Sequence, residues 1–116
     1  MKRVAVPVVE GKLSEHFEEC NFCEIFEIDG DKVKSNETEV IPSDIGKLPE
    51  WAKQQNITDI IAYRIDKNII KLFTKEKINL FIGINIDTSE KLIEGYVNGT
   101  LKSDEKIILE ITSENE

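Results

Sequence analysis

The chain has 116 residues, of which 40% are hydrophobic and 33% are charged, and its formal net charge is −8. This length suits one domain with its own core, and the acidic charge argues against nucleic acid as a partner, because phosphate backbones repel such a surface. No apolar run approaches the roughly 20 residues that span a bilayer, and no signal-peptide pattern opens the sequence, so we expect a cytoplasmic protein without a membrane partner.

The first part of the chain predicts three strands, the last two joined as a hairpin. Residues 3–9 (RVAVPVV) are apolar at both odd and even positions, which indicates a strand buried on both faces. Pro7 indicates the end of that strand or a sheet edge. Residues 22–29 and 32–40 flank an Asp-Gly turn signal, so we expect a hairpin whose second strand is the more exposed.

After the hairpin, the pattern predicts helices that alternate with short buried strands. Asp66 is a predicted helix cap, and Gly99 is a predicted helix stop. The expected order is helix 46–55, strand 58–63, helix 67–76, strand 78–84 and a third helix that begins at Asp87 or Thr88.

The tail is expected to add a short strand over residues 107–111 (IILEI), and residues 113–116 are expected to fray. A hairpin followed by alternating helices and strands predicts one α/β domain, with a mixed sheet flanked by helices.

The segment 14–23 (SEHFEECNFC) holds the one histidine of the chain and both of its cysteines. As a zinc site, His16, Cys20 and Cys23 supply three ligands where a structural zinc ion takes four. As a redox pair, the two thiols lead into a predicted strand rather than a helix, and neighbouring glutamates raise thiol pKa values. A third interpretation contains no site, because cysteine packs as a small buried hydrophobe and histidine serves as a hydrogen-bonded loop residue.

Several motifs follow one another in order: KRVAVPV at the start, Gly11, Ser14-x-His16-Phe17, FxxIFE at 22–27, LPEW at 48–51, DIIA at 59–62, IxLFIG at 78–83 and YVNGTL at 96–101. By their order and spacing, residues 2–100 resemble the dinitrogenase iron–molybdenum cofactor biosynthesis family, whose members carry or process nitrogenase metal clusters.

The resemblance implies a ribonuclease-H-like fold, a mixed β-sheet of about five strands flanked by about three helices. It assigns residues 1–101 to the family-like domain and residues 102–116 to a C-terminal extension, which contains the expected strand 107–111.

The resemblance also implies a non-catalytic protein that binds or carries an iron–sulfur or iron–molybdenum-type cluster. His16 and Cys20 are the expected metal ligands, Cys23 is a further expected cofactor contact, and Arg64 is an expected contact for an anion. Two departures from the family pattern concern the same region: Glu18 stands where relatives usually have glycine, and residues 63–66 (YRID) replace a glycine-rich turn.

A protein that receives the cluster is the expected partner, and a homodimer is an open alternative. Two other functions stay open at this point. One is a protein-interaction or regulatory module that keeps the fold without the cluster. The other is a thiol redox protein that uses Cys20 and Cys23.

Overall fold

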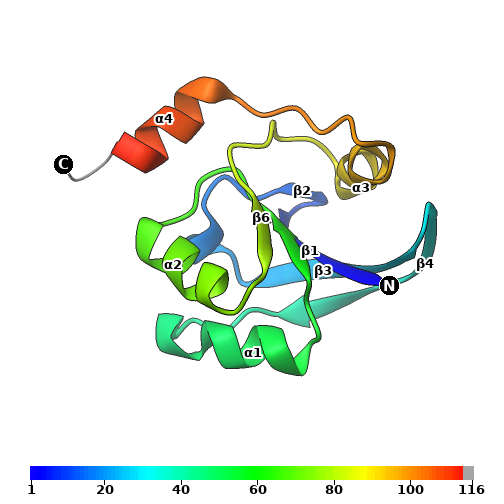
Figure 1. Ribbon diagram of the computed structural model, residues 1–116, viewed down its shortest axis with the longest axis horizontal. Coiled ribbons are helices and arrows are strands. Elements are labelled where there is room, and N and C mark those ends of the chain that lie inside the picture. The colour runs from blue at the N-terminus through cyan, green and yellow to red at the C-terminus, as the bar shows by residue number, and fades with distance from the viewer. Residues whose placement is uncertain (114–116) are drawn as a thin grey trace.

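The structure, a computed structural model, describes residues 1–113 and is built around one mixed β-sheet. The strand order is β4-β3-β1-β5-β6, with β2 paired to β1. Figure 1 shows the sheet between α1 on its lower side and α3 on its upper side. Within residues 1–113 there are six strands and four α-helices, which confirms the predicted α/β class. The strands are β1 (Lys2–Val9), β2 (Lys12–Leu13), β3 (Phe22–Asp29), β4 (Lys32–Val40), β5 (Asp59–Ile61) and β6 (Asn79–Phe81).

Both antiparallel and parallel pairs occur in the sheet. Strand β1 runs antiparallel to β2 and β3 and parallel to β5, and β5 runs parallel to β6. The indication from Pro7 of an edge position is wrong, because β1 is the central strand. Pro7 pairs with Cys23 of β3 and lies beyond Val4 and Ala5, the residues that pair with β5, so its missing N–H interrupts no bond to that strand.

The predicted hairpin is confirmed, and its second strand forms one edge of the sheet. Strand β4 pairs with β3 along its length, with a register shift between Glu27 and Ile28, and nearly all of its side chains are exposed. The exposure agrees with the polar sequence of 32–40.

Helix ends follow the predicted caps. The Asp66 side chain accepts a hydrogen bond from the Asn68 N–H at 2.7 Å, and Thr88, rather than Asp87, caps the third helix. Gly99 ends that helix in the left-handed conformation, at φ 72°, as predicted for a glycine stop. The helices are α1 (Leu48–Gln54), α2 (Lys67–Lys75), α3 (Ser89–Asn98) and α4 (Glu105–Ser113), and two short 3₁₀ helices cover Phe17–Glu19 (η1) and Ile45–Lys47 (η2).

Each face of the sheet has its own apolar core. The core under α1 and α2 contains Trp51 and Phe73, and the core under α3 contains Leu92 and Ile93. Alternation along β1 divides its side chains between the two, so Ala5 belongs to the first core while its neighbours Val4 and Val6 belong to the second.

The predicted strand at 107–111 is wrong, because these residues form part of helix α4. The Asp104 carboxylate accepts a hydrogen bond from the Lys106 N–H at 2.9 Å, as a helix cap does. Ile107 and Ile111, four residues apart, are both buried, so the apolar run follows helical spacing. The predicted fraying at 113–116 falls mostly outside the described residues, since α4 extends to Ser113.

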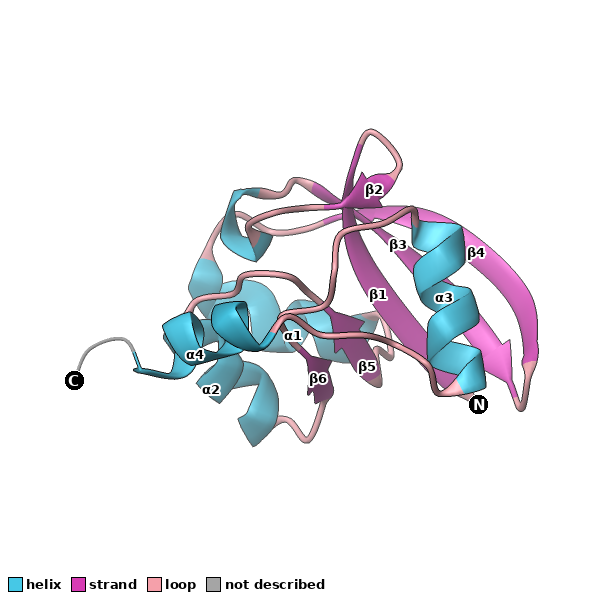
Figure 2. Ribbon diagram, turned by 90° about the horizontal axis from the view of Figure 1, so that it is seen from above, coloured by secondary structure: helices cyan, strands magenta, loops and turns pink. Residues whose placement is uncertain are grey.

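Figure 2 shows α3 and α4 on the same side of the molecule, joined by an extended segment. This segment bonds back to the chain after β6: Ser103 bridges to Ile84, and the Asp104 N–H donates to the Gly83 carbonyl at 2.6 Å. The carboxyl ends of the parallel strands β1, β5 and β6 meet at this edge of the sheet, which we call the carboxyl edge. No helix within residues 1–113 has the length and apolar character to cross a membrane.

Candidate functional site

The loop that carries His16 begins with a tight hairpin turn. Val9 pairs with Lys12, and the two residues between them, Glu10 and Gly11, have φ values of 54° and 81°. Positive φ at both central residues is the type I′ arrangement, which glycine adopts at little cost. The turn directs the chain back along β1, so the Ser14 N–H donates to the Pro7 carbonyl at 2.8 Å.

Two contacts then fix the loop in place. The Ser14 hydroxyl donates to the His16 carbonyl at 3.0 Å, which closes a local turn. The Phe17 ring is buried and meets the Phe73 ring of α2 edge-on, with the ring centres 5.8 Å apart. His16 itself stays half-buried between these anchors.

The structure brings His16 and Arg64 together, although they are far apart in the sequence. They are register partners in a parallel bridge, in which the Phe17 N–H donates to the Arg64 carbonyl at 2.9 Å and the Arg64 N–H donates to the Glu15 carbonyl at 3.3 Å. Arg64 follows β5, so the pair lies at the carboxyl edge. In open sheets with parallel strands, ligands bind outside this edge.

The Arg64 guanidinium contacts groups of this chain. It forms an ion pair with Glu110 of α4 at 2.6 Å, and its centre lies 5.8 Å from the centre of the Tyr63 ring. The hydrogen bond that Arg64 donates to Glu110 raises the Arg64 pKa above its ordinary value, so the side chain stays cationic. About a third of it, 33%, remains exposed. Glu110 was not among the predicted site residues, because residues 107–111 were predicted to form a strand.

A second carboxylate occupies the turn after Arg64. The Asp66 N–H donates to Glu18 Oε1 at 3.3 Å, so Glu18 accepts from a backbone group next to the start of α2. Glu15, Glu18 and Glu19 are all exposed around His16. Within the described residues, no group of three His, Cys, Asp or Glu side chains is arranged to hold a metal ion.

Both thiols point into the protein rather than into the loop. Cys20 is 6% exposed, and its Sγ donates to the carbonyls of Phe22 at 3.0 Å and Val8 at 3.3 Å. Cys23 is 1% exposed, and burial, with smaller contributions from Cys20 and two glutamates, raises its pKa to about 12. The two cysteines belong to the same apolar core and are not bonded to each other.

The positions of these side chains favour some chemistries over others. A redox thiol needs a stabilised thiolate, and the Cys23 pKa opposes one. To act as zinc ligands beside His16, both thiols would have to leave the apolar core in which they are buried. Among the surface groups here, the Arg64 guanidinium and the His16 imidazole are suited to contact an anion, whereas Glu15, Glu18 and Glu19 around His16 repel one.

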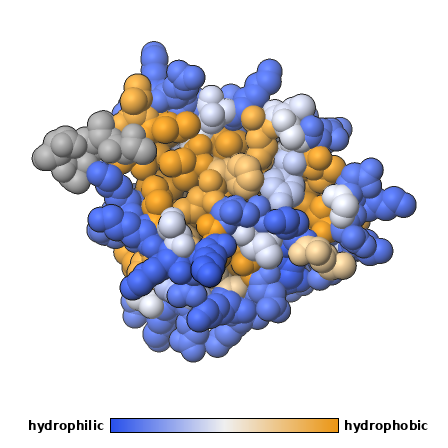
Figure 3. All heavy atoms as spheres, viewed as in Figure 1, coloured by the Kyte–Doolittle hydropathy of each residue, from blue (hydrophilic) through white to orange (hydrophobic). Residues whose placement is uncertain are grey.

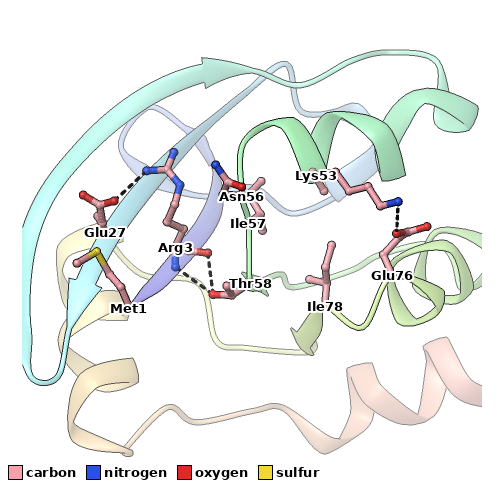
Figure 4. Close-up of a pocket in the computed structure, with 10 residues that line it drawn as sticks. Met1, Arg3, Glu27, Lys53, Asn56, Ile57, Thr58, Glu76 and Ile78 are labelled. Atoms are coloured by element: carbon pink, nitrogen blue, oxygen red, sulfur yellow. Dashed lines mark hydrogen bonds and ion pairs between the residues drawn. The ribbon is translucent and has the colours of Figure 1, made fainter.

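A pocket lies at the opposite end of the sheet from His16 and Arg64, where β1 begins (Figure 4). It has a volume of about 430 Å³ and is lined by charged side chains that pair with one another. Arg3 lies 3.5 Å from Glu27, and Lys53 lies 3.3 Å from Glu76. Mutual neutralisation of these charges leaves the pocket without a convergent set of polar groups for a ligand.

Comparisons with known proteins concern the family and the fold of the chain. A sequence model of the family described as "Dinitrogenase iron-molybdenum cofactor" matches residues 1–99. No curated protein matches the sequence.

Solved structures share the fold over nearly the whole chain. The crystal structure of the protein PH0822 superposes with a TM-score of 0.84 at 25% identity, and the match covers 91% of this chain and 97% of that one. A candidate dinitrogenase from Methanocaldococcus jannaschii is 30% identical, with a TM-score of 0.69 and coverage of 88% and 93%. A candidate NifB protein from Thermotoga, 18% identical with a TM-score of 0.67 and coverage of 89% and 93%, shows the fold alone.

Proposed function

This chain belongs to the dinitrogenase iron–molybdenum cofactor family, and from that premise we propose that it binds and carries an anionic metal–sulfur cluster at its carboxyl edge. The cluster is cargo, so no catalytic residue is assigned. His16 is the proposed metal ligand, and Arg64 is the proposed contact for the negative charge of the cluster.

The pairing of His16 with Arg64 is the observation that carries this proposal. An imidazole that is half-exposed offers a nitrogen ligand to iron or molybdenum, and a guanidinium supplies a permanent positive charge. The backbone bridge at 15–17 fixes their relative position before any ligand arrives. Such preorganisation lowers the entropy cost of binding.

The two thiols are less suited than His16 to bind the cluster. Cys20 lies four residues from His16 but is buried, so it becomes a ligand only if its hydrogen bonds to the Val8 and Phe22 carbonyls break. Cys23, predicted as a further contact, is opposed in that role by its burial and its high pKa. We therefore propose a cluster held by His16 and by charge, rather than one held by several thiolates.

Anaerobic reconstitution tests this function. The protein is incubated with iron and sulfide, or with a preformed cluster, and bound metal is measured by absorption spectroscopy and elemental analysis. We expect His16→Ala and Arg64→Gln to lower bound metal strongly, Cys20→Ala to lower it less, and Cys23→Ala to leave it unchanged. Equal, featureless spectra for wild type and His16→Ala would exclude the function.

A second candidate, an interaction module that has lost the cluster, is favoured by one surface. Figure 3 shows apolar side chains gathered on the face between α3 and α4. Phe81, Ile82, Tyr96 and Leu101 line a pocket of about 320 Å³ on this side. Light scattering of metal-free protein tests the candidate: a stable homodimer would support it, and a monomer at all concentrations would count against self-association.

A further inference from the structure

The last helix lies outside the residues that match the family and against the proposed site. The family match ends at residue 99, and α4 covers Glu105–Ser113. It approaches the chain closely at Gly83, after β6: a Cβ atom built on Gly83 would lie only 2.6 Å from Ile108 Cγ1. Gly83 has φ 68°, so glycine at this position allows both the turn and the close approach of the helix.

A charged contact joins α4 to the site. The Glu110 carboxylate lies 2.6 Å from Arg64, the residue that would hold an anionic ligand. A carboxylate on a guanidinium satisfies the same donors that the cluster would use. Glu18 likewise accepts from the neighbouring Asp66 N–H, so carboxylates of the chain itself contact both of these donors.

We propose that α4 is a C-terminal lid, in which Glu110 competes with the anionic cargo for Arg64. Cargo binds when Glu110 leaves the guanidinium and α4 moves away from the carboxyl edge, and the lid closes again on release. This inference rests on the proposed function, because it describes how access to the same site is regulated.

The contacts of α4 suit a helix that opens. The ion pair is partly exposed, with 33% of the Arg64 side chain and 55% of the Glu110 side chain accessible, and such pairs are weak because water and salt screen them. The apolar attachment consists of Ile107 and Ile111, which are buried, and Ile108 against Gly83, while Leu109 is 64% exposed. A multiply charged anion therefore meets a weak, singly charged competitor at Arg64.

Two readouts on the full chain test the lid, with tetrathiomolybdate, a metal–sulfur dianion, as the probe. Affinity is measured by titration at fixed ionic strength, and α4 opening is measured by hydrogen exchange of the amides of residues 105–113 without the probe. The variants are Glu110→Gln, which removes the competing charge, and Ile111→Ala, which loosens the helix without changing charge. Glu94→Gln on α3 is the control, because it changes the net charge equally at an exposed position.

We expect Glu110→Gln to bind the probe about two- to five-fold more tightly than wild type, the change that follows from losing a partly exposed ion pair. Ile111→Ala should also bind more tightly, both variants should exchange faster within α4, and Glu94→Gln should match wild type.

The outcomes separate the lid from the function on which it rests. Equal affinity of wild type, Glu110→Gln and Ile111→Ala, together with weaker binding by Arg64→Gln, would keep the site and overturn the lid. Absence of binding in every variant would overturn both. Faster exchange in α4 without tighter binding would make α4 a structural element only, and it would also overturn the lid.

Discussion

Two arginines stand at opposite ends of the sheet and are held in different ways. Arg3, where β1 begins, donates through Nε to the Gln55 carbonyl at 2.6 Å and lies 3.5 Å from Glu27 and 3.8 Å from Glu37. Arg64, at the carboxyl edge, has within the described residues one ion-pair partner, Glu110 of α4. The Arg3 side chain is 19% exposed and that of Arg64 is 33% exposed.

The difference lies in the number and the origin of the acceptors. Those of Arg3 come from β3, β4 and the end of α1, all inside the residues that match the family, so releasing this guanidinium would disturb three elements. The partner of Arg64 comes from a terminal helix beyond the match. A cation held by several acceptors from the sheet is part of the structure, whereas a cation held by one partly exposed acceptor is more available to a ligand.

The largest effect should come from exchanging each arginine for an apolar residue of similar length. Arg3→Met removes three acceptor contacts and leaves Glu27 and Glu37 without their cation, so we expect unfolding to become easier by about 2–3 kcal/mol. Arg64→Met should change the urea midpoint little, because its pair is solvent-exposed. Urea unfolding of both variants measures these changes in stability. A midpoint shift for Arg64→Met as large as that for Arg3→Met would contradict the distinction between the two arginines.

A smaller effect is expected where α4 meets the sheet. Gly83→Ala and Gly99→Ala place alanine at φ 68° and 72°, which costs both variants about 1–2 kcal/mol of backbone strain. Only Gly83→Ala also meets Ile108, since nothing lies within 4 Å of a Cβ atom at Gly99. Hydrogen exchange should therefore show faster opening of α4 in Gly83→Ala alone. Equal exchange in the two variants would show that the helix is not held by this close approach.

Unlike the two arginines, the Cys23 thiol is fully buried, and its burial makes stability depend on pH. Burial raises the Cys23 pKa from its ordinary 9.0 to about 12, so folding favours the protonated thiol. This stabilisation is complete below pH 9 and is lost as pH rises toward about 12, at a rate on the order of 1 kcal/mol per pH unit.

Urea unfolding of wild type and Cys23→Ala between pH 8 and about 11 isolates this contribution. The difference in unfolding free energy between the two proteins should shrink as pH rises. A difference independent of pH would mean that the thiol ionises in the folded protein as readily as in the unfolded chain.

The smallest effect is expected at Glu18. Glu18→Gly frees the Asp66 N–H and removes one negative charge near Arg64, so tetrathiomolybdate should bind about two-fold more tightly. Glu19→Gly is the matched control, because Glu19 is also exposed in η1 and changes the charge equally. Equal affinities of the two variants for tetrathiomolybdate would show that only the net charge near His16 affects binding and that the Asp66 N–H does not contribute.

Most of the fold could be predicted because its signals are local. The hairpin at Asp29 and Gly30, the Asp66 cap and the Gly99 stop each depend on residues within a few positions of one another. The segment 107–111 was mistaken for a strand because a short apolar run fits both the helical period and the strand period. Asp104 before it and glutamate in the next position were the available helix signals.

The site could be predicted only in part, because its contacts join distant segments. The sequence drew attention to His16 and Arg64 separately, whereas their pairing depends on a backbone bridge between the loop and the end of β5. The contacts of Arg64 with Glu110 and of Glu18 with the Asp66 N–H depend on tertiary packing, so no local sequence signal predicts them. The burial of Cys23, in contrast, was one of the open interpretations, since cysteine packs well within strands.

Strand β4 has a consequence for the behaviour of this protein in concentrated solution. A nine-residue edge strand is a template for aggregation through intermolecular pairing, and here charged side chains and the register shift next to Ile28 oppose such growth. The hydrogen bond with Glu37 raises the Glu39 pKa, so part of that electrostatic protection is lost at a higher pH than for an ordinary glutamate. Acidification should therefore promote fibril-like assembly along this edge first, which turbidity measurements across mildly acidic pH would detect.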